Sequence, residues 1–306
     1  MRKGLALFTA AMMVFGLAAC GQDKAQEDTA KDATVAAEET ETAEETEAAE
    51  KTEAAKDDKA DADGTTFTVG FDAEFPPYGF MDENGEYVGF DLDLAAEVCK
   101  RQGWELKKQP INWDTKDMEL SSGSIDCIWN GFTMNGREDA YTWSVPYVDN
   151  SQVFVVAKDS GIATKADLAD KIVGVQADSS ALAALEDEEN QENLDLSASF
   201  SSLNQFADYN TAFMELEAGS IDALAMDIGV ANYQLSQRED YEILAGGDAK
   251  EYLATEQYAI GFLLGNDELK DTVESTLMEM VDDGTFAEIA EKYADYGLVD
   301  AVCLGK

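Results

Sequence analysis

Histidine is missing from all 306 residues of this chain. Its absence excludes Ser-His-Asp and Cys-His catalysis, most zinc sites and the usual pH switch near neutrality. Basic residues are scarce too, with 21 Lys and Arg against 64 Asp and Glu and a net charge of −43. We expect no binding to nucleic acid, because that affinity comes from basic side chains that neutralise phosphates. The same argument applies to an anionic membrane surface.

Cysteine is also rare, with four residues at positions 20, 99, 127 and 303. Without histidine and without close spacing, the three later cysteines are not expected to bind a metal. Cys127 lies in an apolar run and is expected to be a buried thiol. No motif calls for a cofactor. The composition therefore predicts a chain with neither a metal nor a cofactor.

A long apolar run occurs at the start of the chain, from Leu5 to Ala19 after the basic Arg2 and Lys3. It is short for a membrane span and typical of a secretory signal, which we place at residues 1–19. The run ends in Leu-Ala-Ala-Cys-Gly, which resembles a lipobox, so Cys20 is expected to carry a lipid. The alternative is an ordinary signal peptide with a chance cysteine.

Residues 20–64 are predicted to be an acidic, disordered tether that follows the lipidated Cys20. From position 21 the segment consists mainly of Ala, Glu, Thr, Lys and Asp and has no aromatic residue. It has too little apolar surface to offset the entropy of folding. The alternative is an acidic tail that binds a partner.

From Thr65 onward, short β-branched or aromatic runs alternate with helical patterns, which predicts parallel α/β layers. The pattern predicts strands at 67–71 and 104–109 and helices at 91–102 and 114–120. A repeat also appears: the nine residues from Met118 to Asp126 return from Met214 to Asp222 with seven identities. Each copy predicts a helix end, a glycine and a strand. We interpret the repeat as two similar lobes, with ligand residues at the strand ends.

Several motifs then resemble extracellular solute-binding proteins of family 3, the polar amino-acid binding proteins of ABC importers. They occur in the family's order over about Thr65 to Leu298: FDAEFPPY from Phe71, GFDLDL from Gly89, GFT from Gly131, VGV from Val173, IDA from Ile221 and DGTF from Asp283. The resemblance implies a type II periplasmic binding protein fold, with two Rossmann-like lobes joined by two hinge strands. It places lobe 1 at 65–150 and 256–306 and lobe 2 at 151–255.

The resemblance also implies where an amino acid's carboxylate binds. Arg137 is suited to it because a guanidinium donates two parallel hydrogen bonds, and we expect no other Arg or Lys nearby. Ser179 and Ser180, at a predicted helix start, would assist, although plain N-capping is the alternative. Two features depart from the family pattern: Thr133 and Arg137 are four residues apart rather than five, and Asp178 replaces a common glycine.

Asp227 is the implied partner of the ligand's ammonium, together with the Thr133 hydroxyl and the Gly131 carbonyl; a helix N-cap is its alternative role. Phe75 and Trp113 match positions that enclose the ligand side chain, or are otherwise core residues. Asp72 and Asn130 would contact the distal end of the ligand. A carboxylate at position 72 favours a basic amino acid first, then glutamine, then cystine or a small polar amino acid. Asp72 alternatively only fixes its loop.

Together with the lipobox, the resemblance therefore implies a monomeric, extracytoplasmic, lipid-anchored protein that delivers an amino acid to an ABC permease and its ATPase. It is not expected to be an enzyme. The rival functions are a dehydratase-like enzyme on the same fold and a lipoprotein that presents its ligand to a separate sensor. Cys99 and Cys303 would both lie in lobe 1, so we expect them to form a disulfide.

Overall fold

A computed structural model describes residues 64–306, which belong to the second of the two units into which the chain divides, 1–58 and 59–306. The expected signal peptide, the lipidated Cys20 and all but the last residue of the predicted tether lie outside the described residues. Along 64–306, no helix has both the length and the apolar character needed to cross a membrane.

The sheet of lobe 1 is centred on β1 (Thr66–Phe71), which is buried from Phe67 onward. β1 pairs in parallel with β5 (Glu105–Pro110) and β6 (Cys127–Ile128), as the alternating pattern predicts. β14 (Gly261–Phe262) and β7 (Thr142–Trp143) extend the sheet antiparallel, in the order β5-β1-β6-β14-β7. The helices of this lobe are α1 (Phe90–Gln102), α2 (Lys116–Ser121), α7 (Asp267–Asp283), α8 (Thr285–Glu291) and α9 (Leu298–Ala301).

The predicted helices and strands at the start of lobe 1 are confirmed to within about two residues. The helix expected at 114–120 is a short 3-10 turn, η1 (Trp113–Thr115), that continues into α2. A small antiparallel sheet covers the end of β1 and consists of β2 (Glu74–Phe75), β3 (Gly79–Met81) and β4 (Tyr87–Val88).

The sheet of lobe 2 has the order β10-β9-β11-β8-β12, and β13 also pairs with β8. β9 (Ile172–Gln176) lies between β10 (Ser202–Phe206) and β11 (Ala223–Asp227), and these three strands are parallel. β12 spans Tyr241–Ile243. The helices of this lobe are α3 (Ser180–Leu185), α4 (Gln191–Ser199), α5 (Tyr209–Glu217) and α6 (Ile228–Leu235), with 3-10 turns η2 (Lys165–Leu168), η3 (Leu244–Gly247) and η4 (Ala249–Glu251). A last turn, η5 (Ala294–Tyr296), precedes α9 in lobe 1.

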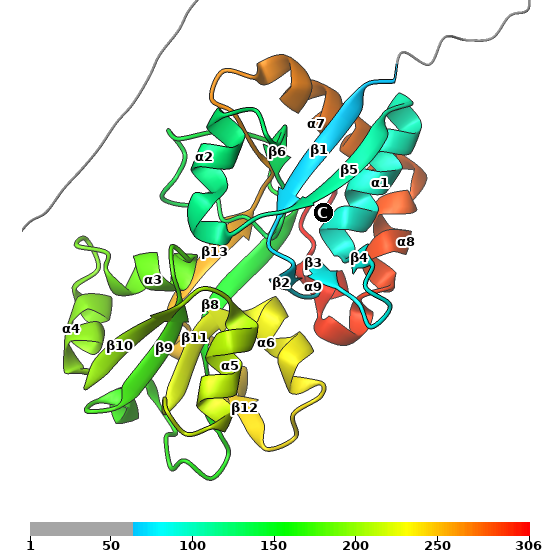
Figure 1. Ribbon diagram of the computed structural model, residues 1–306. Helices are drawn as coiled ribbons and strands as arrows, with labels where there is room; N and C mark the ends of the chain where they lie inside the picture. Colours follow the sequence, from blue (N-terminus) through cyan, green and yellow to red (C-terminus); the bar gives the residue numbers. More distant parts are fainter. Residues whose placement is uncertain (1–63) are drawn as a thin grey trace, which may run out of the picture. The chain divides into compact units, whose positions relative to one another are not determined.

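Two strands run between the lobes (Figure 1). β8 (Val148–Ala157) leaves lobe 1 and continues as an antiparallel neighbour of β11, while β13 (Ala254–Tyr258) pairs with its first half and returns the chain toward β14. Polar side chains on β8 and β13 are therefore positioned next to the contact between the lobes.

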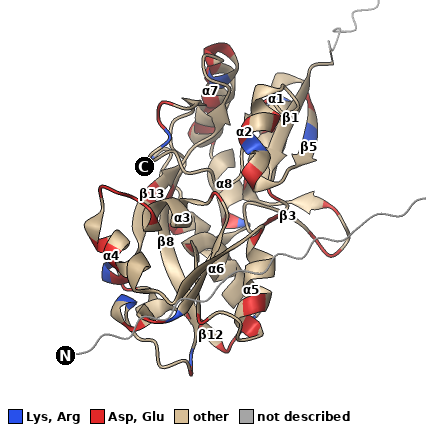
Figure 2. Cartoon of the chain, turned by 60° about the vertical axis from the view of Figure 1, so that its left-hand side comes forward, with Lys and Arg blue, Asp and Glu red and all other residues tan. Residues whose placement is uncertain are grey.

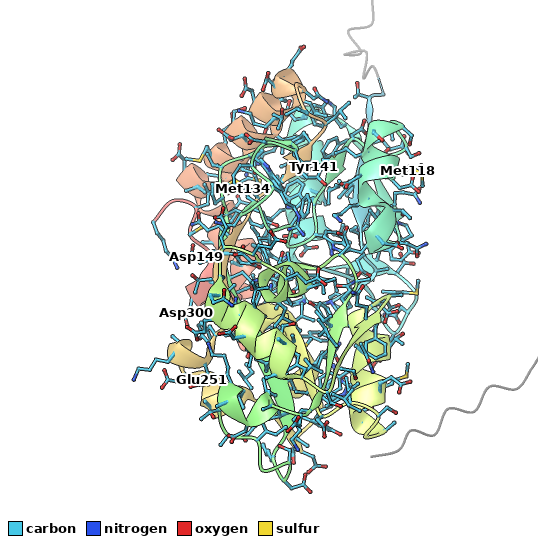
Figure 3. All side chains as sticks on the ribbon, turned by 90° about the vertical axis from the view of Figure 1, so that its left-hand side faces the viewer. Met118, Met134, Tyr141, Asp149, Glu251 and Asp300 are labelled. Atoms are coloured by element: carbon cyan, nitrogen blue, oxygen red, sulfur yellow. The ribbon has the colours of Figure 1, made fainter. Side chains whose placement is uncertain are left out.

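The sequence repeat performs the same structural task in each lobe. The carboxylate of Asp126 accepts a hydrogen bond from the Thr68 N–H at 2.7 Å, at the start of β1. Asp222 accepts one from the Ile172 N–H at 2.8 Å, at the start of β9. Met118 and Met214 occupy the exposed face of α2 and α5, and Met118 lies at the outer edge of lobe 1 (Figure 3). The predicted relation between the lobes thus has a physical basis in a shared strand cap.

Candidate functional site

One turn of lobe 2, residues 176–180 between β9 and α3, receives side chains from three parts of lobe 1. Gln176 Nε2 donates to Asp72 Oδ2 at 2.8 Å, and Ser180 Oγ accepts from Arg137 Nη1 at 3.1 Å. Between them, the Asp178 carboxylate pairs with the ammonium of Lys116. Asp72 and Arg137, which are 65 positions apart in the sequence, therefore meet the same turn.

The guanidinium of Arg137 is held by backbone and ring contacts. Its Nη1 also donates to the Thr133 carbonyl at 3.2 Å, and its Cζ lies 5.4 Å from the centre of the Phe132 ring. The Arg137 N–H closes a turn onto the Met134 carbonyl at 3.0 Å, and Gly136 takes a φ of +78°. The four-residue spacing that departs from the family pattern is thus a tight turn, which still directs Arg137 toward Ser180.

The expectation that no other basic side chain lies near Arg137 is wrong. Lys116, on α2, is 2% exposed and pairs with Asp178, whose carbonyl also accepts from Arg137 Nη2 at 3.5 Å. Lys116 lies 5.0 Å from the centre of the Trp113 ring. Asp178 adopts a left-handed φ of +56° at the position where glycine is common. Here the acidic residue forms an ion pair between the lobes, which a glycine cannot do.

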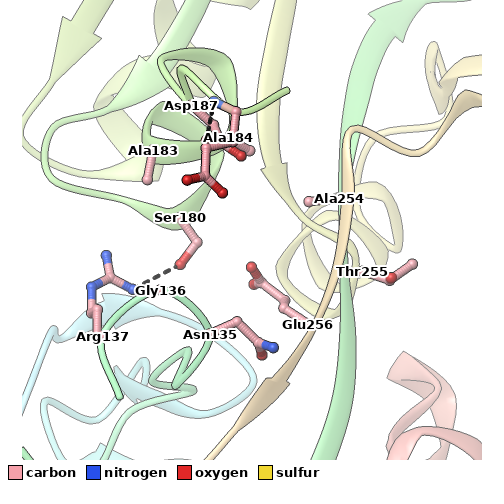
Figure 4. A pocket seen from close by; sticks show the side chains of 11 residues that line it. Asn135, Gly136, Arg137, Ser180, Ala183, Ala184, Asp187, Ala254, Thr255 and Glu256 are labelled. Atoms are coloured by element: carbon pink, nitrogen blue, oxygen red, sulfur yellow. Dashed lines mark hydrogen bonds between the residues drawn. The ribbon is translucent and has the colours of Figure 1, made fainter. Parts of the chain in front are cut away.

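The hydroxyls of Ser179 and Ser180 have different hydrogen-bond partners. The hydroxyl of Ser179 accepts from the Leu182 N–H at 3.2 Å and caps α3, so the N-capping alternative describes this residue. The Ser180 hydroxyl faces Arg137 instead (Figure 4). Among the described residues, Ser180 is the one serine of this pair that forms a hydrogen bond with Arg137.

Asp227 lies at the end of β11 and is buried among polar side chains from both hinge strands. Its Oδ1 accepts from Asn150 Nδ2 at 2.8 Å, from Gln152 Nε2 at 2.6 Å and from the Tyr258 hydroxyl at 2.5 Å. Its Oδ2 accepts from the Tyr209 hydroxyl at 3.1 Å. Asp227 makes no side-chain cap to α6, so the N-cap alternative does not describe it. Burial raises the pKa of this carboxyl above its ordinary value.

Glu256, on β13, joins this group and was not anticipated. Its Oε1 accepts from the Thr133 hydroxyl at 2.7 Å and from the same amides that serve Asp227. Thr133 was expected beside Asp227, and the structure instead pairs its hydroxyl with Glu256. Burial, and then the charge of Asp227, raise the pKa of Glu256.

Gly131 sits where three aromatic rings leave no room for a side chain. It has a φ of +57°, and a Cβ would lie 2.9 Å from Phe75, 3.0 Å from Tyr258 and 3.3 Å from Tyr78. Its N–H donates to Asp91 Oδ2 at 2.6 Å. The neighbouring Asn130 is 1% exposed, and within residues 64–306 neither polar atom of its side chain has a hydrogen-bond partner. Asp91 thus fixes the loop that carries Gly131 and Thr133.

Asp72 both fixes its loop and contacts lobe 2. Its Oδ1 accepts from the Glu74 N–H at 2.9 Å, while Oδ2 accepts from Gln176. Burial is the main reason that the pKa of Asp72 rises to about 6. Phe75 is buried with its ring centre 5.8 Å from that of Tyr209, and Trp113 is half-buried with its ring edge-on to Phe132. Phe75 therefore has the packing of a core residue, and Trp113 keeps an accessible face.

The candidate residues border two cavities. The Arg137 cavity, about 430 Å³, is lined by Arg137, Ser180 and Glu256 together with residues of α3 and β13 (Figure 4). The Asp72 cavity, about 350 Å³, is lined by Asp72, Trp113 and three further acidic residues, Glu74, Glu119 and Asp208. Six other candidates line neither of these cavities: Phe75, Asn130, Gly131, Thr133, Ser179 and Asp227.

The expected Cys99–Cys303 disulfide is not present. Cys99, Cys127 and Cys303, the cysteines of the described range, are free thiols. Cys303 is held beside β8, where its N–H donates to the Tyr147 carbonyl at 2.9 Å, whereas Cys99 is buried on α1. Membership of one lobe did not determine whether two cysteines meet, since a disulfide requires Cα atoms within about 7 Å.

The model of the bacterial extracellular solute-binding proteins of family 3 matches residues 67–296. This chain belongs to that family. The L-cystine-binding protein TcyJ of Escherichia coli is 28% identical over 231 residues, covering 74% of this chain and 82% of the relative. The arginine-binding extracellular protein ArtP of Bacillus subtilis is 25% identical and covers 96% of this chain and 98% of its own.

A solved structure of a family relative also agrees with the fold. The substrate-binding protein of an ABC uptake transporter from Streptococcus pneumoniae, with bound histidine, has a TM-score of 0.68 and 35% identity. The match covers 74% of this chain and 92% of that one. The expected family and two-lobed fold are confirmed. As a member of a solute-binding family, the protein is a binding protein and not an enzyme, as predicted.

Sequence reasoning about this solute-binding protein missed the polar residues of the hinge strands and Lys116. Asn150 and Gln152 are two positions apart and therefore lie on the same face of β8. Glu256 is the one acidic residue of β13, the strand that pairs with this part of β8. Alternating polar residues in a strand between two lobes were the available signal. Lys116 gave no signal, because a lysine on a short helix is ordinarily a solvated residue.

Proposed function

We propose that this solute-binding protein captures a free amino acid between its lobes and passes it to an ABC permease with its ATPase. Basic amino acids are the preferred ligands, glutamine is second, and cystine or a small polar amino acid is third. The relatives named above bind arginine, cystine or histidine, which supports an amino acid as the ligand class.

The distribution of charge carries the proposal. Arg137 and Ser180 at one end of the 176–180 turn offer hydrogen-bond donors for a carboxylate. At the other end, every ionisable residue that lines the Asp72 cavity is acidic. Asp and Glu are also more widespread than Lys and Arg along the backbone of both lobes (Figure 2), and this negative charge favours the approach of a cation. An amino acid with a positively charged side chain fits this arrangement, with its carboxylate at Arg137 and its side chain at the acidic Asp72 cavity.

A calorimetric titration of the purified protein with each standard amino acid, ornithine, citrulline and cystine tests the proposal. We expect the tightest binding for arginine, lysine or ornithine, weaker binding for glutamine and none for glutamate. Tight binding of glutamate would contradict the preference for cations. No binding of any amino acid would contradict the function itself.

The proposed lipid anchor at Cys20 is tested separately. The Cys20→Ser substitution should remove the lipid mass and move the protein from the detergent extract to the soluble fraction, because one cysteine carries the whole anchor. Ligand binding should stay unchanged, since the 64–306 fold has its own core. A Cys20→Ser protein that remains in the membrane fraction would show that the anchor lies elsewhere.

A further inference from the structure

Two buried carboxylates share the same donors at the hinge. Asn150 Nδ2 donates to Asp227 Oδ1 and to Glu256 Oε1, each at 2.8 Å. Gln152 Nε2 donates to the same two oxygens at 2.6 and 2.7 Å. Asp227 Oδ1 and Glu256 Oε1 therefore both lie within 2.8 Å of the same two amide nitrogens. Like charges this close in a buried site are unfavourable unless a proton or a cation lies with them.

No lysine or arginine within residues 64–306 forms an ion pair with either carboxylate. The amide oxygens of Asn150 and Gln152 are also buried, with no partner among the described residues. Two tyrosines, Tyr209 and Tyr258, donate to Asp227, and the ring of Tyr78 packs edge-on against Tyr258 with 5.2 Å between the ring centres. The group therefore offers more acceptors than donors, which is the requirement for binding an ammonium.

The two carboxylates differ in whether they have an oxygen free to accept a further hydrogen bond. Asp227 uses both oxygens on protein donors. Glu256 accepts through Oε1, and within residues 64–306 no hydrogen bond reaches its Oε2. Glu256 also lines the Arg137 cavity, with its carboxylate directed toward the space beside Ser180 (Figure 4). The α-ammonium of an amino acid is two bonds from its carboxylate carbon, so a carboxylate on Arg137 places the ammonium near Glu256.

We propose that Glu256 is a ligand-binding residue whose Oε2 receives the ammonium of the amino acid beside Asp227, and that binding expels a proton held between these two carboxylates. The ligand must carry a free primary ammonium; its N–H groups replace the shared proton, which passes to solvent. The inference rests on the proposed function, because it names the ammonium site of the same ligand. Among the acidic residues, the family motifs pointed only to Asp227 as an ammonium partner.

Calorimetry in two buffers of different ionisation enthalpy measures the number of protons released per ligand. The titrations are run near pH 6, because burial raises the pKa of Glu256 to about 6. We expect release by the unmodified protein, and affinity that weakens as the pH is lowered. Glu256→Gln should bind roughly 10- to 100-fold more weakly, the scale of one hydrogen bond to a charged group, and should lose most of the release. Glu189→Gln is the matched control, since Glu189 lines the same cavity but is exposed.

Asp72→Asn is measured alongside, because Asp72 is a second buried carboxyl with a raised pKa. Proton release that is lost in Glu256→Gln but retained in Asp72→Asn comes from the Asp227–Glu256 pair. Binding by the unmodified protein without proton release would overturn the inference even if Glu256→Gln does not fold. Unchanged affinity and release in a folded Glu256→Gln would overturn it as well. If the unmodified protein binds no amino acid, the proposed function fails instead, so the two failures are distinguishable.

Discussion

Replacing Arg137 by alanine is expected to weaken the binding of every amino-acid ligand by about 2–5 kcal/mol, roughly 30- to 4,000-fold. The reason is that the ligand carboxylate loses its two-pronged donor while it remains desolvated between the lobes. The loss should be similar for basic and neutral ligands, because the carboxylate is common to all of them. Calorimetric affinities for arginine and glutamine measure it.

Two variants make this test specific. Arg137→Lys should restore the charge but not full affinity, since an ammonium lacks the planar fork. Arg101→Ala should bind normally, because Arg101 pairs with Glu97 and Asp283 on α1 and at the end of α7. If Arg137→Ala binds almost as the unmodified protein does, Lys116 becomes the candidate carboxylate partner. Its ion pair with Asp178 places it beside the same turn.

The fold was predictable because its signals are local. Short β-branched or aromatic runs located β1 and β5, and the repeat located β6 and β11. Gly103, Gly123 and Gly219 take the left-handed conformation that often follows a helix, with φ of 71°, 75° and 72°. The repeat located equivalent parts of two lobes, since its Asp accepts a backbone hydrogen bond from β1 in one copy and from β9 in the other. Strand pairing then brings the strand ends to a common edge, which is general for parallel sheets.

The site was predictable only in part, because contacts between lobes depend on side-chain geometry. The sequence motifs pointed to Arg137, Ser180, Asp72 and Asp227, yet no local pattern specifies that Lys116 reaches Asp178. Glu256 meets Thr133 from a strand 123 positions away. Cys99 and Cys303 illustrate the same limit, since they belong to one lobe and are nevertheless free thiols. Distances across the fold, which the sequence does not encode locally, decide such contacts.

Replacing Asp72 by asparagine is expected to weaken arginine binding by roughly 10- to 100-fold and glutamine binding by much less. Asp72 is 6% exposed, so its charge acts on a ligand side chain with little screening by water. Its pKa of about 6 gives the direction of the pH dependence. As the pH falls through about 6, Asp72 gains a proton and arginine binding weakens, whereas a neutral side chain is affected less.

The same raised pKa predicts a change in folding stability. The native state holds the Asp72 proton more tightly than the unfolded state, so the free energy of unfolding should fall as the pH rises from about 4 to about 6. Asp72→Asn removes this cost and should stabilise the ligand-free protein at neutral pH. The gain should be smaller than the roughly 3 kcal/mol that corresponds to a pKa raised from 3.8 to about 6, because the hydrogen bonds from Glu74 and Gln176 are weakened.

Glu74→Gln is the matched control, because Glu74 lines the same cavity but is exposed, and solvent screens its charge. Thermal unfolding and calorimetry of both variants measure the two effects together. Equal losses for arginine and glutamine in Asp72→Asn would show that Asp72 only fixes its loop through the Glu74 N–H. A selective loss of arginine binding with a gain in stability identifies Asp72 as the counter-charge of a basic ligand.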